Sequence, residues 1–185
     1  LTAKVPKEPD EPLRRTLEND LGATGLLVND RLIFGSPAAL YIYGEAVGHK
    51  YRLRVSHDAF FQPDPSVVQR ITKRLSEIIA QERGPNRLKE SLLDVYAGVG
   101  TFGILLAHQV RGVFSVEIGS AAVEDLKFNI KENNVSNLIF HRGAAKSFLR
   151  RFCATAGVCL LDPPRAGLEP QSRQEILRIA PPLIL

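Results

Sequence analysis

The chain has 185 residues, 44% of them hydrophobic, which is enough for one well-formed core and a small second module. No apolar run reaches the roughly 18–20 residues of a membrane-spanning helix and no signal-peptide pattern is visible, so we expect no membrane partner. The formal net charge of +4 permits a nucleic-acid partner without requiring one, because the basic residues are scattered along the chain.

The cysteine content indicates the cellular setting. Cys153 and Cys159 are too few for a disulfide framework or a metal site, and we expect both to be buried thiols in a reduced, cytoplasmic environment. The chain begins on Leu1 and contains no Met, so we expect it to be part of a longer protein. The sequence leaves the oligomeric state open, with a monomer as the default expectation.

Residues 1–57 are predicted to form a partial, β-rich module, in which a weak helix begins at Glu11 and a small antiparallel β part spans residues 24–57. Its short apolar runs fall at residues 25–28, 31–34, 40–43 and 51–55. Asn29-Asp30 separates the first two runs, which is typical of a hairpin. The run Tyr51–Val55 alternates apolar and basic residues, so one face of this strand should be exposed to solvent and positively charged.

Residues 58–185 are predicted to form an α/β domain. Asp64 and Pro65 are typical of a helix start, and an apolar stripe extends this helix to about Glu82. Strands and helices then alternate, with strands at 92–95, 113–116, 138–140 and 158–161 and a fifth strand beginning at 181–185. This alternation predicts a doubly wound, Rossmann-like parallel sheet with right-handed crossovers.

The stretch Leu92–Gly103 predicts a ligand site, because it reads as a buried strand, a glycine turn and the start of a helix at Thr101. Gly98 and Gly100 allow a tight turn and close approach of a ligand to the backbone. Gly103 stands where the third glycine of the dinucleotide-binding fingerprint would come. The pattern is also compatible with a purely structural turn.

A carboxylate ends the next strand. Glu117 follows Asp94 by 23 residues, close to the spacing of about 20 at which an acid accepts hydrogen bonds from a ribose. The combination suits S-adenosylmethionine at least as well as NAD. An NAD-dependent oxidoreductase is the weaker alternative, because it leaves the segment Asp162–Arg165 unexplained.

That segment, Asp162-Pro163-Pro164-Arg165-Ala166-Gly167, follows the strand at 158–161. Two prolines directly after the acid make a stiff, extended exit that lacks two backbone donors. We expect this exit to hold Asp162 facing a pocket at the carboxyl edge of the sheet. The alternative is a proline turn with an incidental Asp.

The motifs together resemble those of the RNA 5-methyluridine (uracil-C5) methyltransferases, a branch of the class I S-adenosylmethionine-dependent methyltransferases. The resemblance covers about residues 25–185 and rests on Phe60-Phe61-Gln62, Asp94–Phe102, Val116-Glu117, Asn129 with Asn133, and Asp162–Gly167. It implies that residues 1–57 are part of an RNA-facing module and that residues 58–185 are a methyltransferase core, incomplete at its C-terminal end.

The resemblance also implies functional residues. Contacts to S-adenosylmethionine are implied for Gln62, Asp94, Tyr96, Gly98, Gly100, Thr101, Glu117, Ala144 and Asp162. Glu117 would hold the ribose hydroxyls, and Gln62 and Asp162 would lie close to the reacting centre, where they could bind the polar edge of uracil. The family has an acidic or amide residue toward adenine at the position of Ala144, whose methyl group cannot make that hydrogen bond.

The implied reaction is methylation of uridine C5 in tRNA or rRNA through a cysteine-linked intermediate. The family carries the nucleophile in a Ser-Cys-Asn-Pro-like segment after the next strand, so we expect it after Leu185 and expect this chain by itself to be inactive. Cys153 and Cys159 lie at neither family position, and a thiol in an apolar strand has a raised pKa. The alternatives are a methyltransferase for another base, such as cytosine C5, and a module that binds RNA or cofactor without transfer.

Overall fold

The structure is a computed structural model that describes residues 11–16, 25–28, 31–35, 38–46, 49–56, 58–59, 64–83, 90–152 and 156–185. The chain forms two compact units, residues 1–39 and 40–185. Phe60-Phe61-Gln62 and Cys153 lie outside the described residues, so the predictions made for them stay predictions.

The first unit contains a short helix, α1 (Glu11–Arg15), and an antiparallel hairpin of β1 (Gly25–Val28) and β2 (Arg31–Gly35). The antiparallel register pairs Val28 with Arg31 and Gly25 with Gly35, which confirms the predicted pairing of these two strands. An irregularity in the register falls between Leu26 and Leu27.

The second unit begins within a two-stranded sheet of β3 (Ala38–Ala46) and β4 (His49–Ser56). The predicted alternation in β4 is confirmed, because Tyr51, Leu53 and Val55 are buried while the side chains between them are at least partly exposed. The division of the chain at residue 57 stays a prediction. In the structure β4 contacts helix α4 (Ser120–Glu132), which lies well beyond that boundary.

The expected positive face of β4 is not a free basic surface. The Arg52 guanidinium pairs with Glu132 of α4 at 2.9 Å, and that of Arg54 pairs with the buried Asp125 at 2.6 Å. Arg54 also lies over the ring of Phe128, 4.4 Å from its centroid. Both guanidinium groups are therefore paired with acids of α4. The alternation of apolar and basic residues in the sequence does not reveal these acidic partners.

Helix α2 (Pro65–Arg83) begins where the sequence predicts. The Asp64 carboxylate accepts the Ser66 backbone N–H at 2.8 Å and so caps the helix. Hydrogen bonds from the Ser66 side chain and from this N–H lower the pKa of Asp64. The buried side of α2 includes Val68, Thr72 and Ile79. Ile71, predicted to belong to this stripe, is 38% exposed, because the buried stripe runs through Thr72 and leaves position 71 at its edge.

The rest of the second unit alternates strands and helices. The strands are β5 (Ser91–Val95), β6 (Gly112–Glu117), β7 (Leu138–Arg142), β8 (Val158–Leu161) and β9 (Leu183–Ile184). The remaining helices are α3 (Thr101–Leu106), the 3-10 turn η3 (Ala107–Gln109), α5 (Ala145–Arg151) and α6 (Pro170–Ile179). The strands form one parallel sheet in the order β7-β6-β5-β8-β9, which confirms the predicted doubly wound α/β fold.

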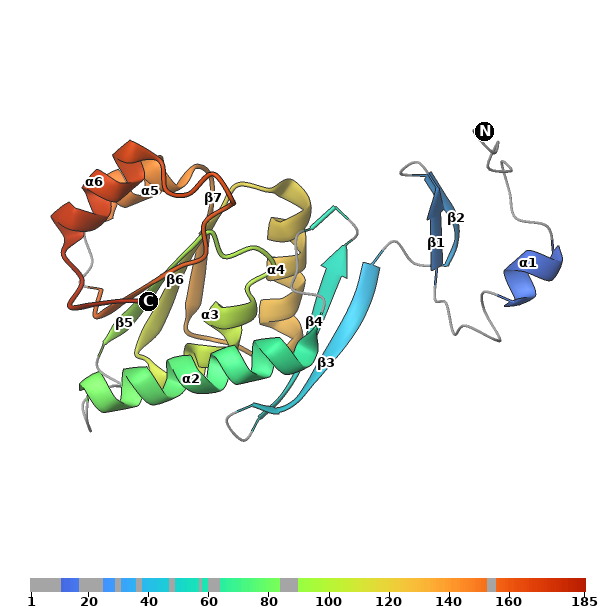
Figure 1. Ribbon diagram of the computed structural model, residues 1–185, viewed down its shortest axis with the longest axis horizontal. Coiled ribbons are helices and arrows are strands. Elements are labelled where there is room, and N and C mark those ends of the chain that lie inside the picture. Colours follow the sequence, from blue (N-terminus) through green and yellow to red (C-terminus); the bar gives the residue numbers. More distant parts are fainter. Residues whose placement is uncertain are drawn as a thin grey trace. The chain divides into compact units, whose positions relative to one another are not determined.

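Helices cover both faces of this sheet (Figure 1). Successive side chains of β5 enter different clusters: Leu92 packs with residues of α2, α3 and α4, while Leu93 and Val95 pack with residues of α5 and α6. Each fully buried Leu or Val contributes about 1.5–3 kcal/mol to stability. The central strands β5 and β8 are therefore mainly apolar, because neither of their faces meets water.

The strand order places a crevice beside β5. The chain passes from β5 outward to β6 and β7, then returns to β8 on the opposite side of β5. The loops after β5 and β8 consequently diverge at the carboxyl edge, where open α/β sheets bind ligands. None of the helices in the described ranges combines the length and apolarity needed to cross a membrane.

Candidate functional site

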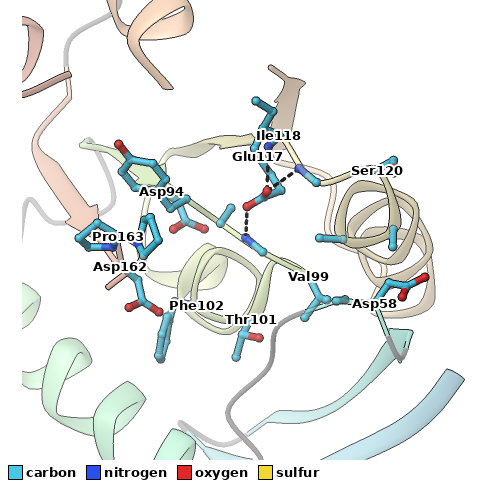
Figure 2. Close-up of a pocket in the computed structure, with 18 of the residues that line it drawn as sticks. Asp58, Asp94, Val99, Thr101, Phe102, Glu117, Ile118, Ser120, Asp162 and Pro163 are labelled. Carbon is cyan, nitrogen blue, oxygen red and sulfur yellow. Dashed lines mark hydrogen bonds between the residues drawn. The ribbon is translucent and has the colours of Figure 1, made fainter. Parts of the chain in front are cut away.

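A pocket of about 1140 Å³ lies at this carboxyl edge (Figure 2). Its walls come mainly from the segments that follow β5, β6 and β8, with Asp58 and Ala59 after β4 and Val68 of α2 completing it. Six of the residues predicted from the sequence line this pocket: Asp94, Tyr96, Gly98, Thr101, Glu117 and Asp162. The volume lies slightly above the range of about 300–1,000 Å³ that is typical of small-molecule sites.

The glycine turn between β5 and α3 has three left-handed residues, Tyr96 (φ 68°), Gly98 (φ 55°) and Gly100 (φ 86°). Gly98 lines the pocket, whereas Gly100 does not. A Cβ at position 100 would overlap the Cδ1 atom of Leu126 in α4. The two glycines therefore serve different purposes: Gly98 adopts a left-handed conformation in the pocket wall, and Gly100 lets the turn pack against α4.

Tyr96 is the strained residue of the turn, since a left-handed conformation costs a non-glycine residue about 1–2 kcal/mol. Its hydroxyl oxygen is buried and has no hydrogen-bond partner among the described residues. A buried phenol normally has a partner. This strain and the unpaired hydroxyl occur together in the pocket wall.

Glu117 organises the wall between β5 and β6. Its Oε2 atom accepts the backbone N–H of Gly98 at 2.9 Å, and its Oε1 atom accepts those of Ile118 at 2.8 Å and Gly119 at 2.7 Å (Figure 2). A carboxylate has about four acceptor sites, so three bonds leave capacity for a ligand. Glu117 therefore fixes the loop and presents negative charge to the pocket.

Asp94 is the most deeply buried acid of the site, with 3% of its surface exposed. Its Oδ2 atom accepts a hydrogen bond from the Ser115 hydroxyl at 3.4 Å, and a Cβ on Gly103 would come within 2.6 Å of the same atom. The pKa of Asp94 is raised to about 7. Desolvation by burial is the main cause and the charges of Asp162 and Glu117 add to it, while hydrogen bonds from Ser115 and the Gly103 backbone oppose it.

Asp162 lies at the exposed rim of the pocket with Pro163, Pro164 and Arg165. The prolines hold the exit of β8 extended, and the segment then turns where the Gly167 N–H donates to the Pro164 carbonyl at 2.7 Å. Figure 2 shows Asp162 on the same side of the pocket as Asp94. The stiff exit thus presents a carboxylate opposite the wall made by Glu117.

The two remaining predicted residues are Ala144 and Gln62. Ala144 precedes α5 and accepts the N–H groups of Ser147 and Phe148 with its carbonyl, but it is not among the residues that line the pocket. Gln62 is outside the described residues. The roles predicted for both stay predictions.

Sequence reasoning missed several lining residues, among them Asp58, Ala59 and Ile118. Asp58 and Ala59 immediately precede Phe60-Phe61-Gln62, so their place in the chain was a usable signal. Ile118 is 65% exposed beside Glu117. An apolar residue directly after a strand-end acid is a signal that can be read from the sequence.

Cys159 is buried within β8, and burial raises the pKa of its thiol to about 12. Asp94 adds to this shift. The raised thiol pKa predicted for an apolar strand is therefore confirmed, and this cysteine is not an activated nucleophile. Among the described residues, no three or more His, Cys, Asp or Glu side chains are grouped to hold a metal ion.

Comparison with known proteins identifies relatives of this chain. The family model for tRNA (uracil-5-)-methyltransferases matches residues 42–180. An uncharacterised RNA methyltransferase of Chlamydia pneumoniae is 34% identical over 84% of the chain and 38% of its own length. The human tRNA (uracil-5-)-methyltransferase homolog A is 35% identical over 62% of the chain and 18% of its own length.

Two solved structures of tRNA methyltransferases have a similar fold. The Pyrococcus abyssi tRNA (uracil-54, C5)-methyltransferase, in complex with S-adenosyl-L-homocysteine, superposes with a TM-score of 0.61 at 26% identity, over 83% of this chain and 35% of that one. The M. jannaschii tRNA m1G37 methyltransferase gives 0.60 at 21% identity over 92% of this chain and 51% of that one, which shows a shared fold. The predicted class I methyltransferase fold is thus confirmed.

The chain spans less than two fifths of the length of the curated relatives named above. The match of the family model nevertheless covers most of the chain, including β5 to β8 and every described residue that lines the pocket. The chain belongs to the tRNA (uracil-5-)-methyltransferase family.

Proposed function

We propose that the protein transfers a methyl group from S-adenosylmethionine to C5 of a uridine in RNA. One observation carries the proposal. The pocket beside β5, where the direction of strand addition reverses, is lined by the glycine turn and by the carboxylates of Asp94, Glu117 and Asp162. S-adenosylmethionine has a diol, a sulfonium cation and an amino-acid end. The pocket offers a partner for each.

The residues present fit this cofactor. Glu117 retains acceptor capacity after binding three backbone N–H groups, which suits a ribose diol. The buried Tyr96 hydroxyl lacks a partner that a polar ligand would supply. Within the described residues, neither Asp94, Glu117 nor Asp162 forms an ion pair with a Lys or Arg. The pocket therefore favours a cationic ligand.

The cofactor supplies the methyl group, and the chain supplies its placement. Asp162 stands at the open rim, where an RNA base flipped from its stack would enter, and Arg165 beside it can meet a phosphate. Gln62 and Asp162 would then bind the polar edge of uracil. RNA as the partner is supported by the family, and the choice of tRNA or rRNA rests on the resemblance described above.

For the chemical step we propose a cysteine thiolate that adds to C6 of uracil, so that C5 becomes the carbon nucleophile. C5 takes the methyl group, a base then removes the C5 proton, and the thiolate leaves as the double bond re-forms. Cys159 cannot provide this thiolate, because it is buried with a raised pKa. We place the nucleophile after Leu185.

The cofactor site is tested by Glu117→Gln. The substitution keeps the shape of the side chain and removes its charge, so the dissociation constant for S-adenosylmethionine, measured by calorimetry, should rise at least tenfold, or about 1.4 kcal/mol. Glu132→Gln is the matched control, since it removes the same charge from the far end of α4, outside the pocket. Equal affinities for the two variants would refute the ribose role of Glu117.

The reaction is tested with the protein that includes the segment after Leu185. RNA treated with methyl-labelled cofactor is digested to nucleosides and separated. Label in 5-methyluridine is the expected result, and its loss in Asp162→Ala would place Asp162 in the site. Label in 5-methylcytidine would identify another target base, and cofactor binding without transfer to RNA would identify a binding module. Either of these two results would overturn the proposed reaction.

A further inference from the structure

Helix α4 has an inward-facing polar stripe at intervals of four residues, made of Asp125, Asn129 and Asn133. Residues four apart lie on one face of a helix. Asp125 and Asn129 are fully buried. Polar side chains in such a position need hydrogen-bond partners, and a helix that packs on a sheet more often presents apolar residues there.

The partners of this stripe are backbone groups of β4. Asn133 accepts the Arg52 N–H at 2.9 Å and donates to the Arg52 carbonyl at 2.8 Å. Asn129 accepts the Arg54 N–H at 2.6 Å and donates to the Arg54 carbonyl at 3.0 Å. The two amides thus bind alternate residues of β4, as the backbone of a neighbouring strand would.

Asp125 completes this series of hydrogen bonds between α4 and β4, which we call the ladder. Its Oδ2 atom accepts the Ser56 N–H at 2.6 Å, and its Oδ1 atom accepts the Ser56 hydroxyl at 3.0 Å. Ser56 ends β4, two residues before Asp58 on the pocket wall. The ladder therefore fixes β4 up to the point where the chain enters the pocket.

Asn129 makes one contact that Asn133 does not. Its Nδ2 group also donates to the Val99 carbonyl at 3.0 Å. Val99 belongs to the glycine turn, is buried and lines the pocket (Figure 2). The second donor bond of Asn133 goes instead to the carbonyl of Asn129 within α4. One buried amide thus joins β4 and the pocket turn.

We propose that Asn129 is a positioning residue that couples β4 to the turn at residues 96–100. Displacement of β4 withdraws the groups that orient the Asn129 amide, and this frees the Val99 carbonyl. By reciprocity, a ligand that fixes the turn stabilises β4. The consequence for cofactor affinity rests on the proposed function, whereas the coupling of the two segments does not.

Hydrogen exchange of backbone amides tests the coupling without any ligand. The turn amides are suited to this, because Tyr96 and Ala97 both donate to the Val116 carbonyl at 3.1 Å. Asn129→Ala should speed exchange in both β4 and the turn, by about fivefold in the turn for one lost hydrogen bond. Asn133→Ala, the matched control, should speed exchange only in the part of β4 at Arg52, because the bonds of Asn129 to Arg54 and Val99 remain. Equal effects of the two variants on the turn would overturn the proposal.

A second measurement covers the case in which Asn129→Ala does not fold. In the unsubstituted full chain, exchange is followed at rising concentrations of denaturant below the unfolding transition. Coupled segments open together, so β4 and the turn should show the same dependence on denaturant. Opening of the turn at clearly lower denaturant than β4 would show that the Asn129 contact does not join them.

Calorimetry with S-adenosyl-L-homocysteine connects the coupling to the cofactor. Asn129→Ala should weaken binding about fivefold. Asn133→Ala should leave the dissociation constant unchanged, because it loosens β4 only at Arg52 and keeps the bonds of Asn129 to Arg54 and Val99. Equal weakening by both variants would mean that β4 acts without the Asn129 link and would overturn the proposal. If the unsubstituted chain does not bind this ligand, the proposed function fails, and the exchange experiment still decides the coupling.

Discussion

Asp94→Asn should change how the stability of the chain depends on pH. Burial raises the pKa of Asp94 from its ordinary 3.8 to about 7, and the unfolded chain restores the ordinary value. Each pKa unit corresponds to about 1.4 kcal/mol, so ionising Asp94 in the folded chain costs about 4 kcal/mol. The stability associated with the neutral acid is complete below pH about 4 and is lost as the pH rises through about 7.

The asparagine variant removes this dependence, because its amide has nearly the same shape as the neutral acid and does not ionise. Denaturant unfolding at pH 4 to 8 should therefore find the two proteins similar near pH 4 and the variant more stable at pH 8, by up to about 4 kcal/mol. A constant difference between them across this range would refute the buried ionisable carboxyl.

Ser115→Ala supplies an independent check of the same reasoning. The Ser115 hydroxyl donates to Asp94 and lowers its pKa, so its removal should move the pH range of lost stability upward. The two substitutions thus have opposite effects at pH 8: Asp94→Asn stabilises the chain, and Ser115→Ala destabilises it. A variant that merely loosened the core would lower stability equally at every pH.

Gly103→Ala should destabilise the chain, because the new Cβ would lie 2.6 Å from Asp94 Oδ2, although alanine normally favours a helix by about 1 kcal/mol. Urea unfolding measures the change in stability. Gly112→Ala is the tolerated control, because its Cβ would meet only the Asn137 carbonyl oxygen at 3.5 Å. A gain in stability for Gly103→Ala would contradict this packing. Cys159 should resist iodoacetamide at pH 8 in the folded chain and react once the chain is unfolded, because its thiol is buried with a pKa of about 12. Mass spectrometry locates the modification, and rapid labelling of Cys159 under native conditions would mean that β8 is not buried.

The order of strands and helices was predictable because each element carries its own signal. The strands at β5 and β8 are short apolar runs, and α2 starts at an acid followed by proline. The alternation of strands and helices then predicts a parallel sheet with right-handed crossovers, while the order of the strands in it is seen only in the structure. Glu117 and Asp162 could be placed at one edge for the same reason, since carboxyl ends of parallel strands meet there.

The contacts that shape the pocket were not predictable in this way. Glu117 was read as a carboxylate for a ligand, and the structure shows that it also binds the backbone of Gly98, which lies 19 residues away in the chain. The need for glycine at position 103 arises from Asp94 beneath it rather than from a ligand. Such requirements depend on which atoms meet across elements, and spacing in the sequence does not specify that.

The charges of the second unit show where a ligand is needed. Acids of α4 already have cations as partners, as in the pairs of Asp125 with Arg54 and Glu132 with Arg52. The carboxylates of Asp94 and Glu117 have only neutral donors among the described residues, and their mutual repulsion contributes to the raised pKa of Asp94. Buried negative charge without a cation lowers stability. A sulfonium cation in the pocket would relieve this repulsion, so the same carboxylates that destabilise the empty pocket would contribute to the affinity for the proposed cofactor.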